Sequence, residues 1–173
     1  MPHVSPLIGH LAPDCIWRLE RAAEQRFREA DHLRAKGCSL AALYLYGYSV
    51  EMCLSAAYYS SVGFSPSASI DREARRRRMA QARQLKTASG EPLMNNDPHP
   101  LVGWARFLEW QRSASTNLSS SAKQRLQHAV RRAGLVYKHW RPELRYKTAA
   151  VTPTQVDEVR RAASWFVENR GRL

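Results

Sequence analysis

Residues 39–60 (SLAALYLYGYSVEMCLSAAYYS) form an almost uninterrupted run of apolar and aromatic residues. The run holds five of the seven tyrosines and a single acid, Glu51. A carboxylate at mid-depth and tyrosines throughout would be costly in hydrocarbon, so the pattern disfavours a membrane-spanning helix. A helix that is apolar on most sides is typical of the centre of a soluble bundle, where neighbours surround it. The pattern therefore predicts a buried central helix.

Before this run, apolar residues recur at steps of three and four, as on one face of a helix. They are Ile16, Leu19, Ala23, Phe27, Ala30 and Leu33. Asp14 is placed to cap this helix, and Gly37 is placed to end it just before Ser39. Because the connection is so short, we expect the two helices to be antiparallel neighbours.

Residues 63–100 differ in character from the helices on either side. Clusters of Ser, Pro and Gly flank an arginine-rich stretch at 72–86. We interpret the segment as a basic, partly irregular insertion between bundle helices, with an exposed helix of its own.

Three helices are predicted beyond the insertion. The first covers about 101–111 and is rich in aromatic residues. The second opens at Ser121, which forms a capping-box pattern with Gln124, and carries Leu126, Val130 and Leu135. It ends near residue 140, because the proline at 142 cannot continue a helix.

The last helix has the clearest start signal. Thr152 as cap, Pro153 at the first helical position and Gln155 three residues after the cap agree with one another. Its predicted buried positions are Val156, Val159, Ala163, Phe166 and Val167. With no convincing strand and no repeat, residues 1–173 are predicted to form a single all-α domain.

Composition adds a strong positive charge. Twenty-seven Lys and Arg stand against 15 acids, a net charge of +12, and 22 of the basic residues are arginines. Arginine binds phosphate and stacks on flat partners, so this bias favours a nucleic-acid partner. The alternative is a basic surface without a specific partner.

The cysteines and the N-terminus indicate a reduced, cytoplasmic protein. Cys15, Cys38 and Cys53 lack metal-ligand spacing, and Cys53 is expected to be buried in the apolar run. Residues 1–14 do not have the pattern of a signal peptide. No Gly-rich phosphate loop, HExxH motif or paired-carboxylate cluster is present, so we expect no cofactor and no metal.

Residues 27–59 (FREADHLRAKGCSLAALYLYGYSVEMCLSAAYY) resemble the opening helical hairpin of HEPN-domain proteins. In that family a helix of the form A-x-x-L-x-x-x-G precedes an A-x-Y-L-x-G-Y-x-x-E-x-x-L-K-A helix. The matching positions are Ala42, Tyr44, Leu45, Gly47, Tyr48, Glu51, Leu54 and Ala56, while Ser55 replaces the usual lysine. Two later blocks, HPLVGWARFLEW (99–110) and HWRPELRYKT (139–148), are also similar to members with a long third section.

The resemblance implies an up-and-down bundle of four to five helices, usually a homodimer, with the insertion at about 63–100 after the second helix. Many members are metal-independent endoribonucleases of toxin–antitoxin or defence systems. Their Arg-x(4–6)-His motif, paired across a dimer, activates the 2′-hydroxyl of RNA. Other members have lost the motif and bind nucleotides or nucleic acid, or serve as partners of nucleotidyltransferases.

Two stretches fit the motif, Arg132 to His139 and Arg26 to His32. Chance alone gives roughly two matches in a chain so rich in arginine. The family usually places Asn, Asp or His after the arginine, whereas Ala133 stands here. Arg132 and His139 would share a face of one helix, and an imidazole beside a guanidinium suits acid–base cleavage of RNA. Alternatively, His139 caps a helix end and Arg132 is a solvated charge.

Other residues are candidates for binding. A phosphate backbone would fit the exposed basic stretch, although a solvated helix face is the alternative. Its arginines are Arg75, Arg76, Arg77, Arg78 and Arg83. Arg141 is a further candidate, whereas Arg145 is expected to pair with Glu51, because a carboxylate in an apolar helix needs a partner. Tyr58 and Tyr59 are expected in the core and at a dimer interface, with base stacking as the alternative.

The favoured hypothesis is a cytoplasmic, homodimeric, non-catalytic HEPN-like protein that binds RNA or a nucleotide through arginine-rich surfaces, without a cofactor and away from membranes. One alternative is a metal-independent toxin-type endoribonuclease that uses Arg132 and His139. The other is a structural docking partner of a nucleotidyltransferase or an antitoxin.

Overall fold

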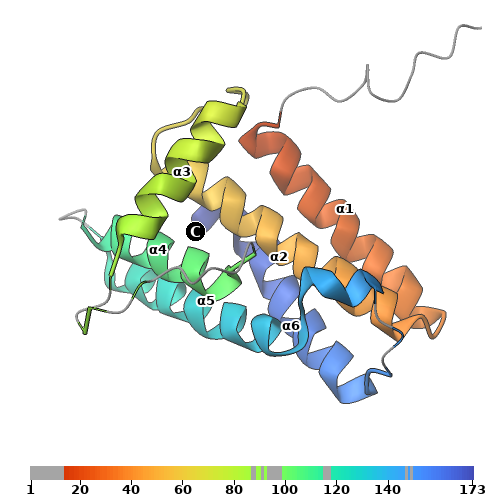
Figure 1. Ribbon diagram of the computed structural model, residues 1–173. Helices are drawn as coiled ribbons and strands as arrows, with labels where there is room; N and C mark the ends of the chain where they lie inside the picture. The colour runs from red at the N-terminus through yellow and green to blue at the C-terminus, as the bar shows by residue number, and fades with distance from the viewer. Residues whose placement is uncertain are drawn as a thin grey trace, which may run out of the picture.

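The computed structural model describes residues 14–86, 89–90, 92, 99–114, 118–146, 148 and 150–173. Within them the chain forms helices and no strand, so the all-α prediction is confirmed (Figure 1). The elements are α1 (Ile16–Ala35), α2 (Ser39–Ser61), α3 (Arg72–Gln84), α4 (Leu101–Ser113), α5 (Ser120–His139), the 3₁₀ turn η2 (Pro142–Tyr146), α6 (Pro153–Asn169) and the 3₁₀ turn η3 (Arg170–Arg172). Residues 87–88, 91 and 93–98 of the predicted insertion lie outside this description.

α2 lies at the centre of the bundle, with α1, α4 and α6 packed around it (Figure 1). Its buried side chains run from Ala42 to Tyr59, and Leu43 and Tyr46 are completely buried. By length and composition, α2 is the one described helix that could cross a membrane, and 56% of its most apolar window is buried inside the protein. The predicted central helix is therefore confirmed.

The turn between α1 and α2 forms as predicted. Gly37 has a φ of +77°, a conformation that glycine adopts without strain. The N–H of Cys38 donates to the carbonyl of Leu33 at 2.9 Å, and the N–H of Gly37 donates to that of Arg34 at 3.0 Å. This pair of bonds is the Schellman motif, which satisfies the last carbonyls of α1. The chain then reverses, and α1 and α2 lie side by side as antiparallel neighbours (Figure 1).

The start of α1 differs from the expectation. The helix begins at Ile16, and Cys15 holds the N-cap position without a side-chain hydrogen bond. Asp14 lies one residue too early to cap it. The carboxylate of Asp14 instead pairs with Arg75 of α3, and its carbonyl accepts from the N–H of Ile70 at 2.6 Å. Asp14 therefore ties the start of α1 to the segment around α3.

α4 runs in the same direction as α2, which corrects the simple up-and-down order. Glu51 contacts His99, which precedes α4, and Ser61 contacts Gln111 near the end of α4. Residue numbers therefore increase in the same direction along both helices, so α2 and α4 are parallel. Between Ser61 and His99 the chain must therefore return from the end of α2 to the level of Glu51. The expected alternation of direction resumes with α5 and α6 (Figure 1).

The predicted start and core of α5 need correction. The N-cap is Ser119, whose side chain accepts a backbone N–H of the first turn, so Ser121 lies inside the helix. Leu126 is buried as predicted, whereas Leu135 is 45% exposed. Val136, one position later, is buried in its place.

The predicted boundary of α6 is confirmed. The Thr152 side chain accepts from the N–H of Gln155 at 3.3 Å, and the Gln155 side chain accepts from the N–H of Thr152 at 2.9 Å. Pro153 occupies the first helical position. The five predicted core positions are all buried: Val156, Val159, Ala163, Phe166 and Val167.

Candidate functional site

The predicted catalytic pair faces a neighbouring helix. Arg132 and His139 lie on the side of α5 that packs on α6. The Arg132 guanidinium lies 5.3 Å from the centre of the Trp165 ring, and its buried Nε has no hydrogen-bond partner among the described residues. The Nε2 of His139 donates to Glu158 Oε2 at 3.1 Å, and this histidine side chain is only 10% exposed. Both groups are therefore engaged in the contact between α5 and α6.

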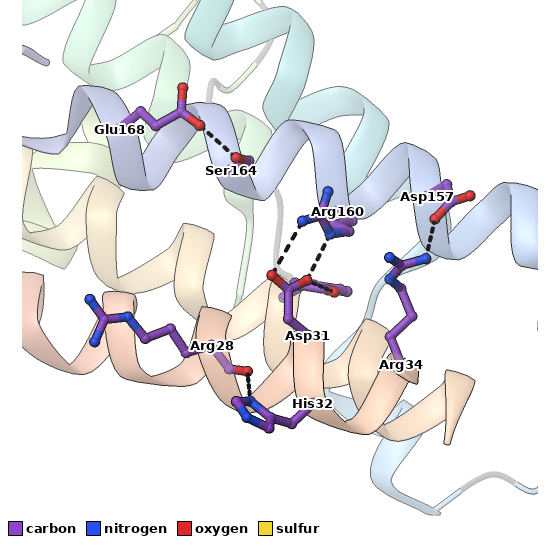
Figure 2. A network of polar contacts seen from close by, with 9 residues as sticks. Arg28, Asp31, His32, Arg34, Asp157, Arg160, Ser164 and Glu168 are labelled. Atoms are coloured by element: carbon purple, nitrogen blue, oxygen red, sulfur yellow. Dashed lines mark hydrogen bonds and ion pairs between the residues drawn. The ribbon is translucent and has the colours of Figure 1, made fainter. Parts of the chain in front are cut away.

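The second Arg–His match lies on the outer surface of α1. Arg26 pairs with Glu29 at 2.8 Å, and His32 Nδ1 donates to the carbonyl of Arg28 at 2.8 Å. Figure 2 shows His32 turned back on its own helix, whereas Asp31 reaches toward α6. Arg26 and His32 thus each contact a neighbouring residue of α1.

A network centred on Asp31 joins α1, α2 and α6 (Figure 2). Asp31 accepts from Arg160 Nε at 2.7 Å and from the Tyr46 hydroxyl at 2.5 Å. Arg34 and Asp157 add a second ion pair between α1 and α6 at 3.1 Å. Partial burial acts to raise the pKa of Asp31, but the hydrogen bonds from Arg160 and Tyr46 outweigh it and hold that pKa below its ordinary value. These contacts hold α1, α2 and α6 together, so we assign the network a structural role.

α3 presents most of its arginines to solvent, among them Arg72, which was not a predicted binding residue. The exposed ones are Arg72, Arg75, Arg76, Arg77 and Arg83. Arg75 pairs with Asp14, and Arg77 pairs with Glu73 at 2.7 Å. Arg72, Arg76 and Arg83 form no ion pair with the described residues. Their spacings of four and seven residues place them on one side of α3, in a row that we call the α3 arginine row.

Arg78 departs from the binding expectation because it is only 8% exposed. Its guanidinium carbon lies 3.6 Å from the centre of the Trp104 ring and 5.0 Å from that of Tyr58, and it donates to Ser55 Oγ at 2.9 Å. Burial lowers the pKa of the Arg78 guanidinium, an effect that the adjacent tyrosines and Glu51 oppose. Arg78 therefore anchors α3 to α2 and α4 through stacking on aromatic rings.

The sequence offered a signal for this anchor. Ala74, Arg78 and Ala82 recur every four residues, and Leu85 follows three positions later. That is the spacing of the buried face of a helix, and Arg78 and Ala82 are indeed buried. Because residues 75–78 are all arginine, composition did not distinguish Arg78, which belongs to the buried face, from its exposed neighbours.

The blocks that carry the family resemblance meet around Trp140. This tryptophan is completely buried, and its Nε1 donates to the carbonyl of Tyr44 at 2.9 Å. Its ring lies against Gly47, where an added Cβ would come within 2.1 Å of the indole. Tyr48 packs edge-on against it, with ring centres 5.3 Å apart. Gly47 and Tyr48 of the α2 pattern thus form the surface on which the Trp140 indole packs.

Glu51 has a partner that sequence reasoning missed. His99 Nδ1 donates to Glu51 Oε1 at 2.7 Å, and the two side chains are 31% and 21% exposed. The His99 ring also lies 6.3 Å from those of Tyr48 and Trp140. The side chain of Arg145, the predicted partner of Glu51, lies outside the described part of the structure. No periodicity could have found His99, because it precedes α4 and is brought to α2 by the fold.

Arg141 is partly buried against its own segment. Its guanidinium carbon lies 3.3 Å from the centre of the Tyr137 ring, and it donates to the carbonyl of Trp140 at 2.7 Å. Tyr146, at the end of η2, is 74% exposed. These contacts fix Arg141 at the edge of the bundle, apart from the α3 arginine row.

Tyr58 and Tyr59 belong to the core, with exposures of 4% and 2%, so neither offers a ring face to a ligand. Trp110 on α4 does, because it is 52% exposed. A surface pocket beside it is lined by residues of α3 and α4 and by Val62 and Leu85, which directly follow α2 and α3. The structure therefore places an exposed aromatic ring close to the basic helix, a feature that the sequence pattern of α4 did not distinguish from core.

The remaining chemistry of the described residues is simple. The thiols of Cys15, Cys38 and Cys53 are free, and burial raises the pKa of Cys53 to about 12. No group of three or more potential metal ligands gathers in the part of the chain that the structure describes. Comparison of the chain with known protein families, curated proteins and solved structures gave no match.

Proposed function

We propose that this chain is a non-catalytic, HEPN-like protein that binds RNA through the exposed side of α3. The observation that carries the proposal is the α3 arginine row: Arg72, Arg76 and Arg83 are exposed, aligned and without ion pairs to the described residues. A row of guanidinium groups matches the repeated phosphates of a nucleic-acid backbone. A homodimer, as the family resemblance implies, and a cytoplasmic location are part of the proposal.

The anchoring of α3 supports a defined binding surface. The buried Arg78 holds the helix against Trp104 of α4 and Ser55 of α2, and Gln81 adds a bond from the Tyr58 hydroxyl at 2.8 Å. These contacts orient α3 before any ligand binds. A preorganised row of charges loses less conformational entropy on binding than the same charges on a disordered segment.

The alternative of a toxin-type endoribonuclease receives less support from the geometry. His139 would have to leave Glu158 and become accessible before it could act as a base, and Arg132 would have to leave Trp165. The docking alternative would use the same basic row, since an acidic partner protein is attracted by the same charges.

The test incubates the purified protein with a fluorescein-labelled 12-nucleotide RNA, measures polarisation and then resolves the RNA on a denaturing gel. We expect a salt-sensitive complex and intact RNA, with the same outcome for His139→Ala. Cleavage to fragments with cyclic phosphate ends that disappears in His139→Ala would establish the ribonuclease instead. Absence of any RNA complex at low salt would refute the proposal.

A further inference from the structure

An exposed tryptophan stands at the end of a column of stacked rings. Trp110 lies 6.2 Å from Phe107 with 12° between the ring planes, and Phe107 lies 5.3 Å from Tyr58 with 27° between them. Tyr58 and Phe107 are buried, whereas Trp110 is 52% exposed. The column therefore fixes a large aromatic ring at the surface from inside the core.

A surface pocket of about 230 Å³ opens beside this ring. Val62, Leu85 and Phe107 form the apolar part of its lining, together with Trp110. The pocket is smaller than typical sites for drug-sized ligands, which run to about 300–1,000 Å³. Its size and apolar lining suit one flat ring system.

The polar part of the pocket lining consists of glutamine amides, and two of them have a fixed orientation. Gln81 Oε1 accepts from the Tyr58 hydroxyl at 2.8 Å, and Gln111 Oε1 accepts from Ser61 Oγ at 3.1 Å. Each amide also has an NH₂ donor and a further lone pair on its oxygen, so it can bond to a ligand either as a donor or as an acceptor. The pocket lining contains no Asp or Glu. It is therefore a neutral site that offers amide hydrogen-bonding groups beside an aromatic ring.

The pocket is continuous with the basic helix. Gln81, Gln84 and Leu85 belong to the end of α3 or the residue after it, next to Arg83. An adjoining pocket shares Val62 and Gln81 with this one and is lined by Arg77. A phosphate bound by the α3 arginines and a base at Trp110 would thus be separated by no more than about the length of α3.

We propose that the Trp110 pocket receives one unpaired base of the RNA that binds α3. The inference rests on the proposed RNA binding. Bases of a single strand stack on aromatic side chains, whereas those of a duplex are already stacked on one another. The amides of Gln81 and Gln111 can form hydrogen bonds with the edge of a base stacked on Trp110.

The test compares the affinities of wild type and variants for labelled U₁₂, A₁₂ and the U₁₂–A₁₂ duplex at one salt concentration. Trp110→Ala should weaken U₁₂ binding about 5- to 150-fold, and Trp110→Phe should retain most of it. Trp17→Ala is the matched control, because Trp17 is 54% exposed on α1 and does not line the Trp110 pocket. It should leave the affinity unchanged.

The outcomes separate this inference from RNA binding itself. If Arg72→Gln/Arg76→Gln/Arg83→Gln weakens U₁₂ binding while Trp110→Ala does not, the base pocket is refuted and the α3 surface stands. Equal loss of duplex and single-strand binding in Trp110→Ala would also overturn it, since a stacking site for an unpaired base leaves the duplex unaffected. Circular dichroism of each variant confirms that the helices remain folded.

Discussion

Replacing Gly47 with alanine should destabilise the protein, although alanine is the better helix former. Gly47 lies inside α2, where the indole of Trp140 presses on the helix backbone. An added Cβ would lie 2.1 Å from Cδ1 and 2.2 Å from Nε1 of that ring. Non-bonded carbon atoms prefer about 3.5–4.0 Å, so the indole would have to withdraw by well over 1 Å.

The expected loss of stability follows from the contacts that the Trp140 indole would lose if it moved away from α2. Overpacking of a core costs about 1–3 kcal/mol, and a buried indole N–H that loses its partner costs about 1–3 kcal/mol. Here that partner is the carbonyl of Tyr44, at 2.9 Å. Helix propensity returns about 1 kcal/mol for glycine to alanine. The net loss should be about 1–5 kcal/mol, which lowers the Tm by roughly 2–20 °C in a chain of this size.

Urea unfolding followed by circular dichroism at 222 nm measures this change. The matched control is Gly134→Ala within α5, where nothing lies within 4 Å of the added Cβ. It should stabilise the protein by up to about 1 kcal/mol. In a Trp140→Ala background, Gly47→Ala should cost nothing, because the clash is gone. The reasoning is refuted if Gly47→Ala unfolds at the same urea concentration as wild type, or if its penalty persists without Trp140.

Three further predictions concern single side chains. Asp31→Asn should lower the free energy of unfolding by about 1–2 kcal/mol at pH 7. The pKa of Asp31 in the folded protein lies below its ordinary value of 3.8. Wild type should therefore keep its greater stability above pH 3.8 and lose it as the pH falls below 3.8 and Asp31 becomes protonated. Urea titrations from pH 7 to 3 should therefore converge for the two proteins, and parallel curves would contradict the account. Cys38, which is exposed, should react with a thiol reagent in the native protein, whereas Cys53 should react only after unfolding; rapid labelling of Cys53 would contradict its burial. His99→Gln should change urea stability by about 1 kcal/mol or more, because it disturbs the partner of the partly buried Glu51; no change would show that this contact is incidental.

Much of the fold follows from local signals in the sequence. Gly37 and the Thr152–Gln155 capping box mark helix ends through interactions among a few neighbouring residues. The apolar run at 39–60 predicts a central helix because only surrounding helices can bury so many of its sides. Such signals depend on the residue types alone, so they could be found without the structure.

The features that were missed depend on contacts between distant segments. The direction of α4 is set by the path of the chain through α3, which no periodicity reports. His99 meets Glu51 across 48 positions of sequence, and Trp140 seats on Gly47 across an even longer separation. Arg78 could have been found from its place in the α3 stripe, but charge composition suggested exposure. Arginine burial requires a particular set of aromatic neighbours, and only the fold supplies them.

The central claim is that the α3 arginine row binds RNA, and the salt dependence of RNA affinity tests it most directly. The variant Arg72→Gln/Arg76→Gln/Arg83→Gln is compared with Arg28→Gln/Arg131→Gln/Arg161→Gln, which removes the same charge from exposed arginines of α1, α5 and α6. Each phosphate contact to a single strand contributes about 0.7 to the slope of log affinity against log salt. The α3 variant should lower the magnitude of that slope by about 2, and the control should leave it nearly unchanged. Equal slopes for the two variants would contradict the account.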